Sequence, residues 1–370
     1  MKKVIIAMSG GVDSSVAAYL LKMQGYEVEG VTYYMYEQEV NNNMTTCSSL
    51  KSVKEVSDIA DCFGIKHEII DIRKEFSKMV IEPFINAYQK GKTPNPCIIC
   101  NRFIKFPMLL EKAKERNASY ISTGHYAIVE KVEKSNRAIL RKGIDPKKDQ
   151  SYFLYALNQD ILKKLILPLG SMTKDKVRKL AHEIGLPSLE RQESQEICFI
   201  QGRNYKSFIQ SHLSFASRHG NIMHVNGGII GKHKGIYNYT IGQRKGMGIA
   251  FTEPLYIVKI DPINNIIIAG PREYAKKREF LVSEINWIEQ PSIKKNDLIK
   301  ASVKIRSTMK EQPATIYFYN NQDENHNETV QPLNSKVLKI VFDEPQWAPA
   351  PGQSAVFYVK DIVLGGGIIL

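Results

Sequence analysis

The sequence predicts an α/β protein in which a doubly wound parallel sheet comes first, a small central α+β domain follows, and a β-barrel ends the chain. Three observations carry this prediction. Apolar strands alternate with amphipathic helices over about the first 200 residues, short glycine-rich basic segments fill residues 202–274, and alternating apolar runs broken by Pro, Gly and Asn follow from about 278. With 370 residues the chain exceeds one ordinary core, and we place its domains at 1–201, 202–274 and 275–370.

The elements of the first domain follow in order from the spacing of apolar residues. The first strand is KVIIAM, and the helix after it repeats apolar residues three and four apart until Gly25. Further strands are predicted at 26–35, 65–72 and 118–126, and further helices at 52–63, 103–116 and 173–184. A hairpin is predicted at 127–144, and the barrel strands are predicted at 301–307, 314–319, 336–342 and 354–370.

The composition excludes several classes of protein. No run approaches the roughly 18 apolar residues of a membrane span, and the apolar run after Met-Lys-Lys is too short for a signal peptide. We therefore expect a cytoplasmic protein with no membrane partner. The cysteines are few and odd in number, which argues against a framework of structural disulfides and leaves catalysis, redox chemistry or metal binding open. They are Cys47, Cys62, Cys97, Cys100 and Cys198.

The net charge of +13 is concentrated in the middle of the chain. Residues 101–200 carry 19 Lys and Arg against 12 Asp and Glu, and residues 201–300 carry 15 against 7, whereas both ends are near neutral. A polyanion is the natural partner for this basic belt. The alternative is a general enrichment in lysine, which the neutral ends do not favour.

Residues 7–21, AMSGGVDSSVAAYLL, join the first strand to the first helix through two glycines, an aspartate and several hydroxyls. Glycine lets the backbone turn with positive φ and approach a ligand, and the N–H groups that begin a helix attract an anion. A Walker A motif is excluded because residue 86 is Asn, and no G-x-G-x-x-G follows the first strand. S-G-G-x-D-S-S instead resembles the PP-loop of ATP pyrophosphatases; the alternative is a glycine-rich turn with a Ser or Asp cap.

The segment GKTPNPCIICNRFIKF places Cys97 and Cys100 in C-x-x-C spacing, after two prolines that hold the turn open and before a helical run. Cys198 lies much further along the chain, in SQEICFI. A thiolate attacks electrophiles or carries sulfane sulfur when its pKa is lowered, here by a helix N-terminus or by Arg102 and Lys105. Half of a zinc site is the alternative, but the second C-x-x-C pair is missing.

Seven segments together resemble the tRNA-uridine 2-sulfurtransferases, also called tRNA 2-thiouridylases or the MnmA family. They are SGGVDSSVAAYLL, TPNPCIICNRFIKF, STGHYA, KDQSYFLYAL, SQEICFI, YTIGQRKGMGI and APGQSAVFY, in this order, and they span essentially the whole chain. The resemblance implies an adenylating PP-loop domain, a small central domain and a C-terminal β-barrel. It also implies an enzyme that replaces O2 of the wobble uridine of tRNA by sulfur, using ATP, which becomes AMP and pyrophosphate, and Mg²⁺.

The resemblance assigns roles to individual residues. Cys100 is the expected nucleophile and Cys198 is the residue expected to receive a persulfide. The other assignments are ATP binding by Ala7, Met8, Ser9, Gly10, Gly11, Val12, Asp13, Ser14, Tyr33 and Gly124, contact with the target base by Asn95, Pro96 and Cys97, and contact with tRNA by Lys148, Asp149, Gln150, Arg306 and Ser307. The family often has methionine at the position of Tyr33 and Arg-Tyr at the position of Arg306 and Ser307.

Cys97 is a further departure, because many relatives carry aspartate at this position. Cys97, Cys100 and Cys198 could together hold a [4Fe–4S] cluster with one open iron that binds the incoming sulfide. The residues alone allow either this cluster or a persulfide on Cys198. The resemblance favours the persulfide. Its sulfur either attacks C2 of the uridine directly or is released as sulfide by Cys100, which leaves a transient Cys100–Cys198 disulfide bond that must be reduced.

The implied reaction needs further partners. The wobble base lies in a single-stranded loop and is readily flipped into a site, and Tyr152 and Phe153 are candidates to stack on it. The alternative for Phe153 is a core position on a helix face. We expect a sulfur donor protein, either a cysteine desulfurase or a sulfur relay protein, and a monomeric enzyme. His125 is either a ligand-side hydrogen-bond partner or a structural histidine. The rival functions are another PP-loop ligase or amidotransferase, for which no glutaminase nucleophile is evident, and a non-enzymatic RNA-binding protein.

Overall fold

A computed structural model describes residues 1–36, 50–132, 135–186, 197–200, 204–213, 218–289, 298–318 and 337–370. Contacts between residues divide the chain into two compact units. The first unit comprises Met1–Glu82, Pro96–Arg203 and Asp361–Val363. The second unit comprises Pro83–Asn95, Asn204–Lys360 and Leu364–Leu370.

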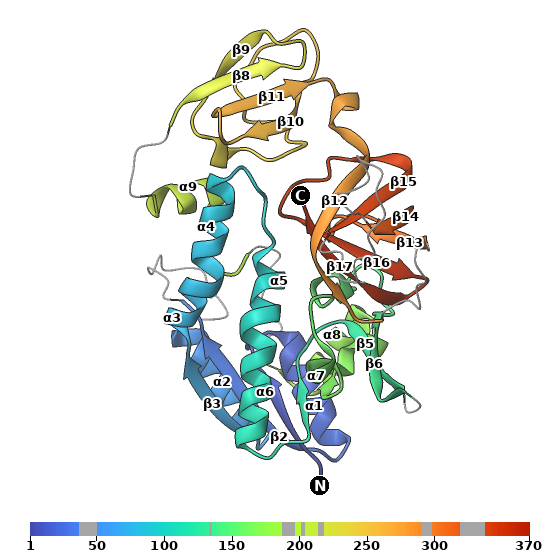
Figure 1. Ribbon diagram of the computed structural model, residues 1–370. Helices are drawn as coiled ribbons and strands as arrows, with labels where there is room; N and C mark the ends of the chain where they lie inside the picture. Colours follow the sequence, from blue (N-terminus) through green and yellow to red (C-terminus); the bar gives the residue numbers. More distant parts are fainter. Residues whose placement is uncertain are drawn as a thin grey trace. The chain divides into compact units, whose positions relative to one another are not determined.

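The first unit is built on a five-stranded parallel sheet with the order β3-β2-β1-β4-β7. Figure 1 labels β2 and β3 of this sheet. Its strands are β1 (Lys3–Ala7), β2 (Glu27–Tyr34), β3 (Lys66–Asp71), β4 (Tyr120–Ser122) and β7 (Leu165–Ile166). Val4 in the centre of the sheet is paired with Val28 of β2 on one side and Tyr120 of β4 on the other. The doubly wound parallel sheet predicted from the alternating pattern is confirmed, with β7 as a strand that the pattern did not predict.

Helices cover both faces of this sheet. One face buries Val4, Ile6 and Met8 against three amphipathic helices, α1 (Val12–Met23), α2 (Leu50–Cys62) and α8 (Lys174–Glu183). The other face carries α6 (Phe106–Glu115), which packs on β1 and β4. The apolar residues of each helix therefore recur every three or four positions because one side alone meets the sheet.

Two helical stretches contain a segment of π-helix. The first consists of α3 (Arg73–Phe76), a π-helix at Ser77–Ile81 and α4 (Glu82–Gln89), and the second consists of α5 (Pro96–Cys100), a π-helix at Asn101–Lys105 and α6. The first stretch was not predicted from the sequence. The second begins at Pro96 rather than near 103, because proline suits the first turn of a helix, where its missing N–H costs no hydrogen bond. Pro96, the second proline of TPNPC, thus starts a helix, and both cysteines of the C-x-x-C lie inside it.

The predicted hairpin forms from β5 (Ala127–Val132) and β6 (Arg137–Lys142), and Ile362 and Val363 extend it by pairing with β6. The second unit contains a four-stranded sheet with the order β10-β11-β8-β9 and a closed six-stranded antiparallel barrel in which β12 pairs with β17. The remaining elements are α7 (Gln159–Leu162), α9 (Tyr205–Ser211), β8 (Gly220–His224), β9 (Ile229–His233), β10 (Tyr256–Asp261), β11 (Ile266–Gly270), β12 (Lys276–Trp287), β13 (Ile299–Lys304), β14 (Gln312–Phe318), β15 (Val337–Trp347), β16 (Ser354–Val359) and β17 (Ile362–Ile369). The predicted central α+β part and the C-terminal barrel are confirmed.

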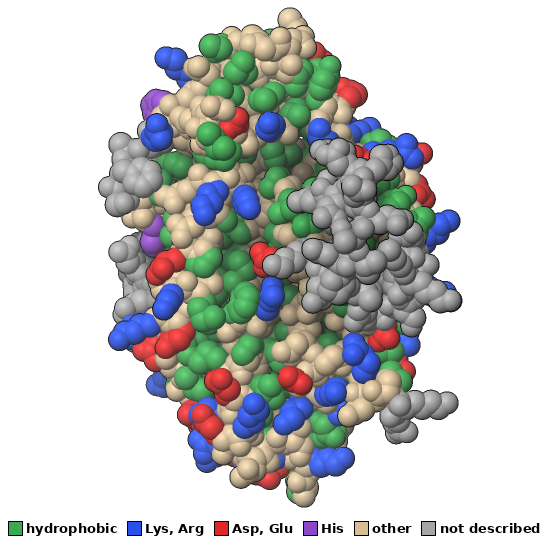
Figure 2. All heavy atoms as spheres, viewed as in Figure 1, with side chains coloured by type: hydrophobic (Ala, Val, Ile, Leu, Met, Phe, Trp, Pro, Cys, Tyr) green, Lys and Arg blue, Asp and Glu red, His purple; other side chains and the backbone are tan. Residues whose placement is uncertain are grey.

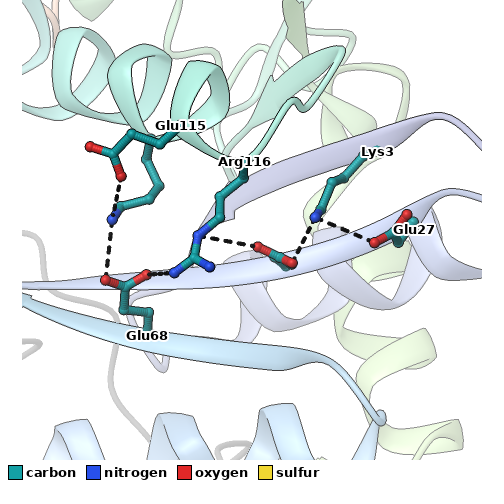
Figure 3. A network of polar contacts seen from close by, with 7 residues as sticks. Lys3, Glu27, Glu68, Glu115 and Arg116 are labelled. Carbon is teal, nitrogen blue, oxygen red and sulfur yellow. Dashed lines mark hydrogen bonds and ion pairs between the residues drawn. The ribbon is translucent and has the colours of Figure 1, made fainter.

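An ion-pair network joins the sheet to α6 on the face that this helix covers (Figure 3). Glu68 of β3 accepts hydrogen bonds from Lys112 (3.1 Å) and Arg116 (2.9 Å), while Lys3 pairs with Glu29 at 2.8 Å. Charged side chains of both signs are also mixed over the lower part of the face in Figure 2.

Among the described residues no helix is both long and apolar enough to cross a membrane.

Candidate active site

The turn between β1 and α1 is the predicted ATP loop, which runs from Ala7 to Ser14. Gly10 has φ +74°, in the left-handed region that favours glycine, and Gly11 is the extended N-cap of α1. The first N–H groups of an α-helix have no partners within the helix and carry the positive end of its dipole. The turn therefore has the geometry of an anion site.

Hydroxyl groups tie this loop to α1. The backbone N–H of Ser9 donates to Oγ of Ser14 at 3.1 Å, and the hydroxyls of Ser14 and Ser15 each donate to the carbonyl of Gly11 at 3.1 Å. These bonds connect the loop to the first turn of α1.

Gly124, just beyond β4, lies against the backbone of the loop. A Cβ atom at this position would lie 2.8 Å from both the carbonyl carbon of Asp13 and the nitrogen of Ser14. Only glycine allows this approach without a shift of backbone. The two predicted ATP-binding segments therefore meet at the carboxyl ends of the neighbouring strands β1 and β4, where ligands of doubly wound sheets bind.

A buried lysine holds the aspartate of the loop. Oδ1 of Asp13 accepts a hydrogen bond from Nζ of Lys174 at 2.7 Å and from the hydroxyl of Tyr126 at 2.6 Å. Lys174 is 5% exposed and is the first residue of α8, where the helix dipole disfavours a positive charge. Its placement depends on Asp13. Sequence reasoning missed both partners, since a single lysine after a threonine cap carries no signal of its own.

Two neighbouring residues of β2 face opposite sides of the sheet and reach different parts of the site. The hydroxyl of Thr32 donates to the carbonyl of Met8 at 2.7 Å, where the ATP loop begins. The hydroxyl of Tyr33, predicted to bind ATP, donates to the carbonyl of Lys105 at 3.5 Å in the π-helix. Burial raises the pKa of Tyr33, and the nearby thiolate of Cys100 raises it further. Tyr33 thus contacts the helical stretch that contains the predicted nucleophile.

Cys100 is the last residue of α5, directly before the π-helix, and is 8% exposed. Burial raises the pKa of its thiol, and the charge and backbone N–H of Lys105 only partly oppose this effect. The expectation that the pKa of the Cys100 thiol is lowered is therefore wrong for the protein without tRNA. Arg102, the other expected cation, lies over the ring of Phe103 at 4.8 Å. A π-helix inserted into an α-helix is frequent at functional sites.

The residues predicted to contact the target base surround the start of α5. Pro96 is buried, Cys97 is exposed, and Asn95 is half-buried directly before them. Within the second unit, the segment TPNP meets APGQ: the N–H of Thr93 donates to the carbonyl of Pro351 at 2.7 Å, and Gln353 donates to the carbonyl of Thr93 at 2.8 Å. Two of the motifs that carry the family resemblance are therefore in direct contact.

Cys198 is half-buried and its backbone is held by aromatic residues. Its carbonyl accepts a hydrogen bond from the hydroxyl of Tyr36, just beyond β2. Tyr36 stacks on Phe76 with ring centroids 6.3 Å apart, and Phe76 meets the edge of Phe199 at 5.8 Å. These contacts place the backbone of Cys198 beyond the carboxyl end of β2.

No disulfide bond joins the described cysteines, which are Cys62, Cys97, Cys100 and Cys198. Among the described residues, no three His, Cys, Asp or Glu side chains gather in a way that could hold a metal ion. The [4Fe–4S] alternative is therefore not supported, because its three ligands do not form a common site. Cys47 lies outside the described residues.

The segment Lys148–Gln150, predicted to contact tRNA, uses two of its side chains to hold its own loop. The carboxylate of Asp149 accepts from the N–H of Gly143 at 3.0 Å, and the side-chain oxygen of Gln150 accepts from the N–H of Tyr126 at 2.9 Å. Tyr152 is completely buried, which contradicts the expectation that it stacks on a base, whereas Phe153 is half-buried.

Arg306, the predicted tRNA contact in the second unit, donates to two backbone carbonyls. Its guanidinium lies 3.2 Å from the oxygen of Ile241 and 2.9 Å from the oxygen of Ala348. These bonds connect the glycine-rich segment around YTIGQ with the end of β15. Ser307 is half-exposed in the turn that follows.

His125 lies at the same carboxyl edge as Gly124. Nδ1 is 2.7 Å from the hydroxyl of Thr123, and the ring packs on Phe106 at 5.7 Å. Burial, with a contribution from the charge of Lys105, lowers the pKa of His125 to about 3, so that the ring is neutral at physiological pH.

Three family models match successive parts of the chain. They are the tRNA methyl transferase HUP domain over residues 2–202, the tRNA methyl transferase PRC-barrel domain over 206–271 and the aminomethyltransferase beta-barrel domain over 277–369. The tRNA-specific 2-thiouridylase MnmA 1 of Caldanaerobacter subterraneus subsp. tengcongensis is 46% identical, covering 99% of this chain and 97% of that protein. The corresponding MnmA of Clostridioides difficile is 43% identical over 100% of this chain and 98% of its own.

Likeness to solved structures is weaker. A 4-thiouridine synthetase in complex with RNA and ATP is 20% identical, with a TM-score of 0.36 over 57% of this chain and 49% of that one. The NMN synthetase of Francisella tularensis is 18% identical, with a TM-score of 0.32 over 55% of this chain and 71% of that one.

Proposed function

The chain belongs to the tRNA-specific 2-thiouridylases, which makes it an enzyme of ATP-dependent tRNA uridine thiolation, and on this premise we propose how its residues divide the work. The observation that supports the division best is the contact of Gly124 with the loop at Asp13 and Ser14. This close approach brings the segment after β4 against the N-terminus of α1, so that both segments border the same anion site.

In the first half-reaction, residues Ala7–Ser14 and Gly124 bind ATP. Tyr33 borders the ATP site on the side of the helical stretch that contains Cys100. Backbone N–H groups of the loop bind the phosphates that leave as pyrophosphate. The donor set also fits Mg²⁺, whose charge offsets that of the phosphates, because Asp13 offers a carboxylate oxygen at the start of α1. Lys174 and Tyr126 hold this carboxylate in place through hydrogen bonds to its Oδ1. The uridine O2 attacks the α-phosphate and displaces pyrophosphate. The oxygen, which is a poor leaving group by itself, can then leave C2 as part of AMP.

In the second half-reaction, Cys198 carries the sulfur as a persulfide and Cys100 releases it. Attack of the Cys100 thiolate on the inner sulfur forms a Cys100–Cys198 disulfide and expels hydrosulfide, which adds to C2 of the uridine and displaces AMP. A dithiol reductant then restores both thiols. The raised pKa of Cys100 keeps it protonated, and so unreactive, until tRNA changes its surroundings.

The wobble uridine of the tRNA substrate binds at Asn95, Pro96 and Cys97. Flipping this base out of the anticodon loop requires little free energy because the loop is single-stranded. The other tRNA contacts we propose are Lys148, Asp149, Gln150, Arg306 and Ser307. The basic residues among them meet phosphates, so that binding weakens with salt. The enzyme works as a cytoplasmic monomer with domains at 1–201, 202–274 and 275–370, and it receives sulfur from a cysteine desulfurase or sulfur relay protein.

The test is a reconstituted reaction that contains the protein, Mg-ATP, unmodified tRNA, a sulfur donor and a dithiol. Digestion of the tRNA and mass spectrometry should reveal 2-thiouridine. Cys100→Ser and Cys198→Ser should abolish it, while Cys62→Ser, at an exposed position at the end of α2, should not. Full activity of either Cys100→Ser or Cys198→Ser would refute the sulfur-transfer route, and absence of any mass gain on uridine in the wild type would refute the reaction.

A further inference from the structure

Three side chains form a hydrogen-bonded chain that ends on the ATP loop. The hydroxyl of Ser57, on α2, lies 3.1 Å from Nδ1 of His67 on β3. Nε2 of His67 lies 2.8 Å from the hydroxyl of Thr32 on β2, and that hydroxyl donates to the carbonyl of Met8 at 2.7 Å. We propose that Thr32, His67 and Ser57 are positioning residues for ATP, acting through the Met8–Ser9 peptide.

The direction of every hydrogen bond in this chain follows from the carbonyl at its end. A carbonyl only accepts, so the single hydrogen of the Thr32 hydroxyl points to Met8. The Thr32 oxygen must then accept from Nε2–H of His67, which leaves Nδ1 of a neutral imidazole to accept from Ser57. Burial lowers the pKa of His67, consistent with the neutral ring that this order contains.

This series of hydrogen bonds fixes the orientation of one peptide group at the start of the loop. The carbonyl of Met8 accepts from Thr32, and the N–H of the same peptide group, on Ser9, donates to Oγ of Ser14 at 3.1 Å. With both ends bonded, the peptide plane cannot rotate, and its orientation sets the direction in which Gly10 and Gly11 continue. This peptide is the entry to the segment that we propose binds phosphates.

Burial makes the bond from Thr32 difficult to replace. Met8 and Thr32 are 2% and 1% exposed, so water has little access to the carbonyl if Thr32 is changed. Gly30, two residues before Thr32, completes the arrangement, because a Cβ there would lie 2.7 Å from Sδ of Met8 and 3.1 Å from Cδ2 of His67. The sheet surface is therefore shaped to bring Met8 and His67 together.

The inference rests on the proposed ATP site, and its primary measurement is ATP binding, which needs neither tRNA nor sulfur. Thr32→Val keeps the shape of the side chain but leaves the carbonyl of Met8 without its donor. We expect the Kd for Mg-ATP, and the KM for ATP in pyrophosphate release, to rise about tenfold, which is about 1.4 kcal/mol. The kcat at saturating ATP and the KM for tRNA should change less than about twofold, because the thiols and the RNA contacts are untouched.

Three further variants separate positioning from simple destabilisation. Thr32→Ser, which keeps the hydroxyl, should restore ATP affinity, and Ser57→Ala, at the far end of the chain, should weaken it about two- to threefold by loosening His67. Thr315→Val makes the same substitution in β14 of the barrel and should leave ATP affinity unchanged.

Wild-type Kd for ATP in Thr32→Val, or equal losses in Thr32→Val and Thr32→Ser, would overturn the proposal. If Thr32→Val does not fold, the Kd values for ATP of Thr32→Ser and Ser57→Ala decide. A wild-type Kd in Ser57→Ala, or a loss in Thr32→Ser as large as in Ser57→Ala, would overturn the proposal. If the wild type binds ATP but makes no 2-thiouridine, the proposed function fails while the ATP measurement still tests the positioning residues.

Discussion

Replacement of Gly124 by alanine tests the ATP site most directly. The new Cβ would lie 2.8 Å from the backbone of Asp13 and Ser14, whereas ordinary contact begins at 3.4 Å, so one backbone must move by about 0.6 Å. Overpacking of this size costs about 1–3 kcal/mol. Because Gly124 touches the loop itself, we expect much of this cost to fall on nucleotide binding, where about 1.4 kcal/mol is a tenfold loss of affinity.

The assay is equilibrium binding of Mg-ATP to the purified variant, with thermal unfolding measured on the same samples. Gly228→Ala is the control, because a Cβ at this exposed position would meet nothing within 4 Å. Gly124→Ala should bind ATP at least about tenfold more weakly than the control. An ATP affinity equal to that of the wild type, in a folded variant, would show that the contact of Gly124 with the loop has no part in binding nucleotide.

Other features of the structure give three more expected outcomes. Lys174→Met and Asp13→Asn should each lower the free energy of unfolding in urea by about 1–3 kcal/mol, and the double variant should lose less than their sum; strict additivity would mean that the 2.7 Å pair contributes nothing. With the other cysteines changed to serine, alkylation of Cys100 should keep accelerating above pH 9.0, since burial raises its pKa above that ordinary value, and a plateau below pH 9.0 would contradict this. The pKa of Glu68 lies below its ordinary value of 4.5. Burial alone would raise this pKa, but the hydrogen bonds from Lys112 and Arg116 lower it. A lowered folded-state pKa stabilises the protein above the unfolded-state value, and this contribution is lost as pH falls, so Glu68→Gln should flatten the decline in stability below about pH 4.5; an unchanged acid profile would refute it.

The fold could be predicted because its elements leave local signals. Gly25, Gly64 and Gly185 mark the ends of three helices, and all three adopt positive φ as helix C-terminal residues commonly do. The stretch Arg73–Gln89 carries signals of the same kind, because Phe76, Val80, Phe84 and Tyr88 recur every four residues and Gly91 follows with positive φ, but it was not among the predicted helices. The helix at Pro96 was missed because prolines were interpreted as a break rather than as a beginning.

The candidate site divides in the same way. Gly10 and Gly11 could be selected from the sequence, since a tight turn beside a ligand favours glycine. Gly124 was assigned through the family resemblance, and its close approach to Asp13 and Ser14 is visible only in the fold. Lys174 could not, because its role arises only when α8 packs beside α1 and brings it to Asp13. The pKa of Cys100 was misjudged for a related reason: charges near a thiol are visible in sequence, whereas burial is a property of the folded chain.

The alternation of side chains along β2 has a consequence for how this enzyme can change. Thr32 and Tyr33 are adjacent, yet one supports the peptide at Met8 and the other the helix that carries Cys100. A slip of this strand by one residue would exchange their faces in a single step. Insertions or deletions within β2 should therefore disable nucleotide activation and sulfur delivery together, while lengthening of the loop after the strand leaves its register intact.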